Sequence, residues 1–230
     1  MSATEPVDVA PAPMGQSKVR AYTLGEEIAN SIIHGLGIGL SIAGLAILLV
    51  YAGQSHNGWA IASSIVYGVS LVLEYTASTL YHSFPQPKVK HVFKIFDHCG
   101  IYLLIAGSYT PYCLVTLRDA GGWLMFWVIW GIAVAGIAAE AFWPYRPRWL
   151  SALLYLGMGW MVVLSIKPLL ANLAPGGVWL LVAGGLAYTV GTVFYVMKKV
   201  KYMHAVWHVF VLAGSICHFL SVLLFVIMAG

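Results

Sequence analysis

Long apolar segments dominate this sequence, and they constrain the fold more than any other feature. Seven of them follow one another, separated by short breaks rich in Gly, Pro, Asn and Asp. Their approximate ranges are 28–52, 59–82, 95–117, 123–142, 149–166, 178–197 and 202–228. A helix that crosses a bilayer needs about 20 apolar residues, and breaks of this composition end helices. The sequence therefore predicts an all-α fold, a bundle of seven transmembrane helices over residues 24–230.

The composition supports the same class. Hydrophobic residues make up 60% of the chain and charged residues only 9%, whereas a soluble domain carries about 25% charged residues. The three cysteines lie in or beside apolar segments, so neither a disulfide scaffold nor a cysteine-rich zinc site is expected. Residues 1–23 contain acidic residues and prolines but no apolar core, and they predict a disordered cytoplasmic tail rather than a signal peptide.

The basic residues predict the orientation. If the N-terminus is cytoplasmic, only Arg118 and Lys167 fall in outside segments. The other ten of the twelve basic residues then fall in inside segments: Lys18, Arg20, Lys88, Lys90, Lys94, Arg146, Arg148, Lys198, Lys199 and Lys201. The positive-inside rule therefore predicts a multi-pass protein of the plasma (inner) membrane, with the N-terminus inside and the C-terminus outside.

Ionisable residues inside the segments point to a site, because each costs about 2.5–3.5 kcal/mol to insert and usually marks function. The topology places His82 at the inner end of the second segment and Asp97 in the first turn of the third. His204 and His208 then fall in the first two turns of the seventh, on one helix face because they are four residues apart. All four residues should therefore share one leaflet.

Three histidines with one open coordination position are typical of a catalytic zinc site. Asp97 could hold a water molecule at such a site or orient a ligand imidazole. A His-x3-His pair alone arises easily by chance, and polar contacts between helices are the alternative explanation for it.

Two lines of polar residues point toward the same leaflet. One comprises Glu74, Ser78 and His82 on the second segment, and Glu74 lies near mid-membrane. For Ser78 the alternative is a hydrogen bond to a carbonyl of its own helix. The other line comprises Glu27, Asn30 and His34 on the first segment.

Other polar residues are expected to have structural roles. Glu140 should pair with Arg146 or Arg148. His218 lies too far along the seventh segment to join the inner site, so packing or polarity of an outer cavity is expected there. His91 and His98 are expected at the inner surface, in solvated or interfacial positions. Pro111 predicts a kink in the third helix.

At the polar motifs the sequence resembles the hemolysin III family, within the progestin and adipoQ receptor superfamily. Glu27-x2-Asn30-x3-His34 resembles the first motif of the family. Ser78-x3-His82, followed by Asp97, resembles the second, and His204-x3-His208 resembles the third.

The resemblance implies a seven-helix bundle in which His82, His204 and His208 hold zinc. It also implies that Asp97 and Ser78 lie near the zinc-bound water, and it suggests a distant likeness to membrane ceramidases, which hydrolyse lipid amides. The family name implies cytolysis, and bacterial members are linked to membrane lipid homeostasis. Kinship of fold does not by itself fix the activity.

Several functions are open at this point. The first is a zinc-dependent hydrolase of lipid amides or esters, for which membrane lipids are the expected partners and a lipid-like molecule the substrate. The second is a non-enzymatic receptor or sensor with structural zinc. A cytolysin is less favoured because no long amphipathic segment is present. A metal transporter is less favoured because no chain of carboxylates crosses the bundle. Neither nucleic acid nor an obligate protein partner is expected.

Overall fold

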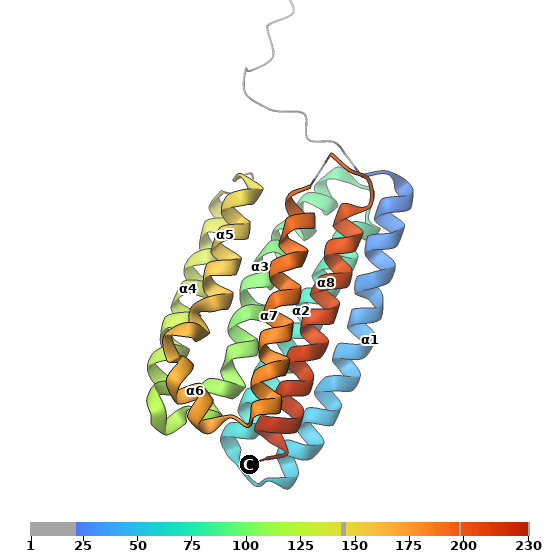
Figure 1. Ribbon diagram of the computed structural model, residues 1–230. Coiled ribbons are helices and arrows are strands. Elements are labelled where there is room, and N and C mark those ends of the chain that lie inside the picture. The colour runs from blue at the N-terminus through green and yellow to red at the C-terminus, as the bar shows by residue number, and fades with distance from the viewer. Residues whose placement is uncertain (1–21, 144–145, 198, 230) are drawn as a thin grey trace, which may run out of the picture.

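The computed structural model describes residues 22–143, 146–197 and 199–229, and these residues form helices and connecting turns without any strand (Figure 1). Seven helical spans are long and apolar enough to cross a membrane. The predicted all-α, seven-span fold is therefore confirmed. Most of the predicted tail lies outside the described residues.

The first three spans are α1 (Leu24–Gln54), α2 (Gly58–Ser83) and α3 (Pro87–Pro111), the last extended by the π-helical turn η1 (Tyr112–Thr116). The fourth combines η2 (Arg118–Gly122) with α4 (Trp123–Phe142). The fifth combines α5 (Arg148–Gly159), the 3-10 turn η3 (Trp160–Ser165) and α6 (Ile166–Asn172). The last two are α7 (Pro175–Val196) and α8 (Met203–Val222), the latter extended by η4 (Leu223–Ile227).

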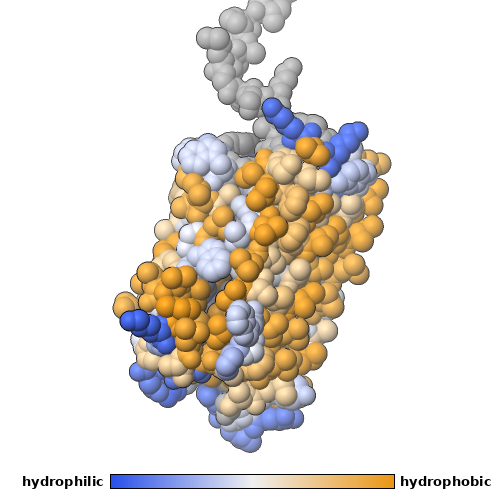
Figure 2. Space-filling model, viewed as in Figure 1, coloured by the Kyte–Doolittle hydropathy of each residue, from blue (hydrophilic) through white to orange (hydrophobic). Residues whose placement is uncertain are grey.

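The helices run side by side along one axis (Figure 1). Helix α2 packs between α1 and α3, α8 packs against α1 and α7, and α4 and α5 pack against α3. Helices α1, α3 and α8 begin at the same end of the bundle, where α2 ends. We call this the histidine end. On the face shown in Figure 2, the side of the bundle is mostly apolar and hydrophilic residues gather at its two ends, as lipid at the side and water at the ends require.

The start of α3 differs from the sequence prediction. The helix begins at Pro87 rather than near Ile95, so Asp97 lies about 15 Å along α3 instead of in its first turn. The basic residues of this stretch lower its hydropathy, but proline is a favourable first residue of a helix. One of these residues, Lys90, donates from its Nζ to the carbonyl oxygen of Tyr81 at 3.1 Å, which ties the start of α3 to the end of α2.

Pro111 is the last residue of α3, and the π-helical turn η1 follows it. The hydroxyls of Ser108 and Thr110 donate to the carbonyl oxygens of Ile105 and Ala106, each at 2.8 Å. Neither bond reaches the carbonyl of Gly107, which lacks its α-helical donor because proline has no N–H. The predicted kink at Pro111 stays a prediction.

Candidate metal centre

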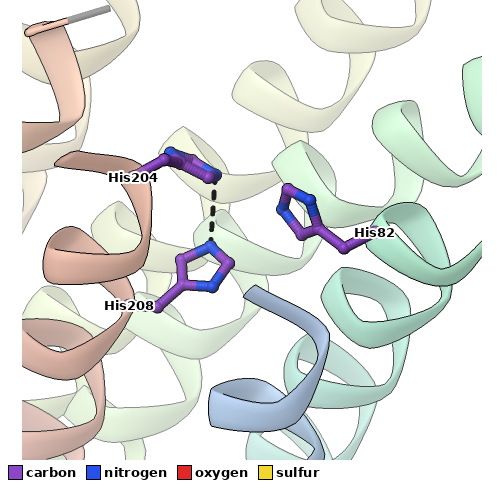
Figure 3. A group of neighbouring side chains, drawn as sticks. All are labelled: His82, His204 and His208. Atoms are coloured by element: carbon purple, nitrogen blue, oxygen red, sulfur yellow. Dashed lines mark hydrogen bonds between the residues drawn. The ribbon is translucent and has the colours of Figure 1, made fainter. Parts of the chain in front are cut away.

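Three imidazoles converge at the histidine end, as the sequence predicts. His82 comes from the last turns of α2, and His204 and His208 come from the first turns of α8 (Figure 3). One ring nitrogen of each residue lies within 4.8 Å of the corresponding nitrogens of the other two. The Nε2 atoms of His204 and His208 are 3.1 Å apart. The four-residue spacing places these two rings on one face of α8, and the antiparallel path of α2 brings the third ring to the same depth.

Glu27 fixes the orientation of the His82 ring. Its Oε2 atom lies 2.6 Å from Nδ1 of His82, and its Oε1 atom lies 2.7 Å from Nζ of Lys90. A carboxylate only accepts hydrogen bonds, so this contact favours the tautomer in which Nδ1 of His82 carries the proton and Nε2 has the lone pair. Nε2 is buried and has no hydrogen-bond partner within the described part of the chain. A carboxylate behind the ring is the usual support of a histidine that binds a metal.

Helix α1 also orients His208. The Nδ1 atom of His208 lies 3.4 Å from the carbonyl oxygen of Asn30, and this contact directs Nε2 toward His204. The ring of His34 stacks on the ring of His208 with centroids 3.6 Å apart and an interplanar angle of 16°. The other side of His34 meets the edge of Tyr75 at 5.0 Å. Glu27, Asn30 and His34 therefore form one supporting face of α1, as their spacing predicts.

A cavity of about 150 Å³ adjoins the centre. Its polar lining at this end includes His204, His208, Asp97 and Glu74, and the remainder is mostly apolar. Asp97 therefore shares a cavity with two of the three imidazoles. Ser78 lies one turn from His82 on α2 and is fully buried. The alternative that Ser78 bonds its own helix is wrong, because its Oγ atom has no partner among the residues described.

The comparison with known proteins agrees with these motifs. A family model described as "Haemolysin-III related" matches residues 22–219. This chain belongs to the haemolysin-III related family.

The chain is 47% identical over 202 residues to "Hemolysin-3" of Bacillus cereus, an alignment that covers 88% of this chain and 92% of the relative. It is 44% identical over 204 residues to "Hemolysin-3 homolog" of Bacillus subtilis (strain 168), covering 89% and 96%. It is 29% identical over 216 residues to "Monocyte to macrophage differentiation factor" of Homo sapiens, covering 90% and 86%. The resemblance to the hemolysin III family is therefore confirmed.

A buried polar network in this haemolysin-III related protein corrects one expectation from the sequence. His98 does not lie at the surface but is 8% exposed, and its Nδ1 atom lies 2.6 Å from Oε1 of Glu140. The predicted pairing of Glu140 with Arg146 is confirmed, and Arg146 also donates to the hydroxyls of Tyr102 at 2.9 Å and Ser151 at 2.8 Å. A lone glutamate in the apolar segment 123–142 signals a buried partner, but the sequence does not show that this partner includes His98.

Two further residues have structural roles outside the candidate metal centre. His218 is not part of the centre, since its Nε2 atom lies 3.2 Å from the carbonyl oxygen of Leu181, and its ring lines a distant part of the cavity. This confirms the expected role in packing and outer-cavity polarity. Gly100 allows Glu74 to reach α3, because a Cβ atom at Gly100 would lie 2.0 Å from Oε2 of Glu74.

Proposed function

We propose that this multi-pass membrane protein binds one zinc ion through His82, His204 and His208 and hydrolyses the amide or ester bond of a membrane lipid. The observation that carries the proposal is the convergence of three imidazole nitrogens within 4.8 Å. The buried Nε2 atom of His82, which has no hydrogen-bond partner among the described residues, adds to it. Three neutral imidazoles suit zinc better than the hard cations that prefer oxygen ligands.

The proposed chemistry divides between the ion and the chain. A zinc ion, when bound, polarises a carbonyl group and makes water more acidic. Asp97 accepts a proton from the attacking water and returns it to the leaving group, as a general base and then a general acid. Ser78, whose hydroxyl is not engaged by the described residues and which does not line the cavity, would position water beside the centre. Glu27 and the Asn30 carbonyl hold the imidazoles in the tautomers that present Nε2.

The shape of the cavity supports a lipid substrate. Its lining follows α7 from Tyr195, near the histidine end, to Val178. These residues are 17 positions apart, which corresponds to about 25 Å along a helix. Val178, Leu181 and Val182 make the end of this path far from the metal centre apolar. A single hydrocarbon chain can lie along the cavity with its amide or ester group beside Asp97 and His208.

The proposed location is the plasma membrane, with the centre close to its cytoplasmic face. At the histidine end, the start of α3 carries Lys88 and Lys90, and the α7–α8 connection carries Lys199 and Lys201. At the opposite end, Arg118 begins η2 and Lys167 lies in α6. This imbalance favours a cytoplasmic histidine end. Lipid turnover in the inner leaflet fits a role in membrane lipid homeostasis.

Hydrolysis is tested with purified, zinc-loaded protein in lipid vesicles that contain a long-chain lipid amide or ester. Release of free fatty acid is measured by mass spectrometry. We expect release by the wild type and none by His208→Ala. His56→Asn is the matched control, because His56 is exposed in the α1–α2 turn at positive φ, which asparagine tolerates. Equal release by His208→Ala and the wild type would refute the zinc mechanism.

A receptor or sensor with structural zinc is the second candidate, because the three imidazoles connect α2 with α8. Under this alternative, removal of zinc lowers the thermal stability of the bundle and no lipid is hydrolysed. A cytolytic activity is the third candidate, because the two Bacillus relatives are named as hemolysins. Leakage of erythrocytes exposed to purified, reconstituted protein is the observation that would favour it.

A further inference from the structure

A polar face runs along almost the whole of α2. It comprises Ser64, Tyr67, Glu74, Ser78 and His82, which are spaced by three, seven, four and four residues and are each at most 3% exposed. The 18 residues from Ser64 to His82 span about 27 Å along a helix. The hydrocarbon core of a bilayer is about 30 Å thick. Polar groups therefore recur from the candidate metal centre through most of the membrane, with the apolar Leu71 between Tyr67 and Glu74 on the same face.

Every member of this face has a buried side-chain atom without a hydrogen-bond partner among the residues described. These atoms are the hydroxyl oxygens of Ser64, Tyr67 and Ser78, Oε2 of Glu74 and Nε2 of His82. Buried polar atoms in folded proteins are satisfied by other protein groups or by ordered water. Such groups are especially costly inside a bilayer, where no bulk water reaches them. The Nε2 atom of His82 is the proposed zinc ligand, and the other four atoms on this helix face indicate a shared partner.

The groups opposite α2 provide further polar contacts. The hydroxyl of Tyr75 donates to Oγ of Ser215 at 2.8 Å, and the hydroxyl of Tyr188 lies 2.9 Å from the same oxygen. Tyr67, Tyr75 and Tyr112 lie in one buried cluster, and Tyr188 packs against it. A water molecule within such a group of hydroxyls finds the two to four polar partners that a buried water needs.

We propose that this face of α2 holds a column of ordered water molecules that leads from the metal centre to Ser64. The proposed column ends at Ser64, because the preceding turn of α2 carries the buried apolar residue Ala60.

The column is separate from most of the cavity that adjoins the metal centre. Of the five residues on the α2 face only Glu74 lines that cavity, whereas Ser64, Tyr67 and Ser78 do not. A hydrocarbon chain in the cavity therefore leaves the column in place. Water can reach the centre from this side while the substrate fills the other. This supply role rests on the proposed hydrolase activity, but the presence of the column does not.

Hydroxyl-radical footprinting of the wild-type protein in lipid nanodiscs tests the column. X-ray pulses generate radicals from bound water, and side chains beside buried water are oxidised although bulk solvent does not reach them. Tyr67 and Tyr102 form a matched pair, because both are 1% exposed. The hydroxyl of Tyr102 is engaged by Arg146, whereas that of Tyr67 is not engaged by the described residues. We expect oxidation of Tyr67 to be several-fold faster. Equal protection of the two tyrosines would overturn the proposal.

A variant tests the continuity of the column. Glu74→Leu replaces the central carboxyl with an apolar side chain of similar size. Oxidation of Tyr67 should then fall to the rate of Tyr102, and the rate of Tyr102 should not change. Rapid oxidation of Tyr67 in a folded variant would refute a column continuous with the centre. If the variant does not fold, the oxidation rates of Tyr67 and Tyr102 in the wild-type protein still test whether the column is present. If Tyr67 is oxidised rapidly but the protein hydrolyses no lipid, the column is supported and only its role in supplying water to the reaction is refuted.

Discussion

Removal of the Glu27 carboxylate is expected to weaken zinc binding without removing a ligand. Glu27 lies 2.6 Å from Nδ1 of His82, whose side chain is fully buried. Hydrogen bonds to charged groups contribute about 1.5–3 kcal/mol. Loss of a group that supports a metal ligand lowers metal affinity about 10–100-fold, which corresponds to about 1.4–2.7 kcal/mol. We expect Glu27→Ala to lower the zinc affinity about 100-fold, because no carboxylate then holds the ring of His82. Glu27→Gln should lower it about tenfold, because its amide oxygen still accepts the hydrogen bond.

The affinity is measured by competition with a chromophoric zinc chelator in detergent. Lys90→Met is the matched control, because Lys90 contacts the other oxygen of Glu27 at 2.7 Å and its side chain is 27% exposed. A partly exposed pair of this kind contributes at most about 1 kcal/mol, so the control should bind zinc with nearly wild-type affinity. Wild-type zinc affinity in Glu27→Ala would refute the argument that this carboxylate sets the tautomer of His82.

Three further predictions concern packing and catalysis. Glu140→Ala leaves Arg146 buried without its carboxylate, so it should destabilise the bundle by about 3–5 kcal/mol, and an unchanged thermal midpoint in detergent would contradict this. Gly37→Ala should cost about 1–3 kcal/mol in the same assay, because its Cβ would lie 2.4 Å from a tyrosine ring carbon of α2. Gly39→Ala has no neighbouring atom within 4 Å of its Cβ and should stabilise by up to about 1 kcal/mol, so equal effects of the two changes would refute the packing argument. Asp97→Asn should slow lipid hydrolysis about 10²–10⁴-fold while zinc content is unchanged, and undiminished hydrolysis would exclude Asp97 as the base.

The fold could be predicted from the sequence because lipid imposes a simple requirement on it. Each span must be apolar and long enough to cross the bilayer, so counting apolar segments identifies all seven. The ends of the spans are less well determined. Helix α3 extends back to Pro87 through basic residues that hydropathy alone assigns to a loop. The fifth span breaks into α5, η3 and α6 after Gly157 and Gly159 and just before Pro168, whose missing N–H leaves the carbonyl of Leu164 in η3 without an α-helical donor.

The candidate site could be predicted in part. The four-residue spacing of His204 and His208, together with the span topology, places them in the same leaflet as His82. The contact between Glu27 and His82 depends on the rotation of α1 about its own axis, which sequence spacing does not determine. The contact between His98 and Glu140 depends in the same way on how α4 faces α3. Contacts between helices therefore required the structure, whereas the common end of the bundle for His82, His204 and His208 did not.

Zinc content tests the central claim most directly. Wild-type protein purified without added metal is analysed by mass spectrometry beside His204→Ala and the exposed-histidine control His56→Asn. The convergence of His82, His204 and His208 predicts one zinc ion per chain in the wild type and the control, and almost none in His204→Ala. A wild-type protein that neither contains zinc nor binds it when it is supplied, or a His204→Ala protein that keeps a full equivalent, would contradict the account.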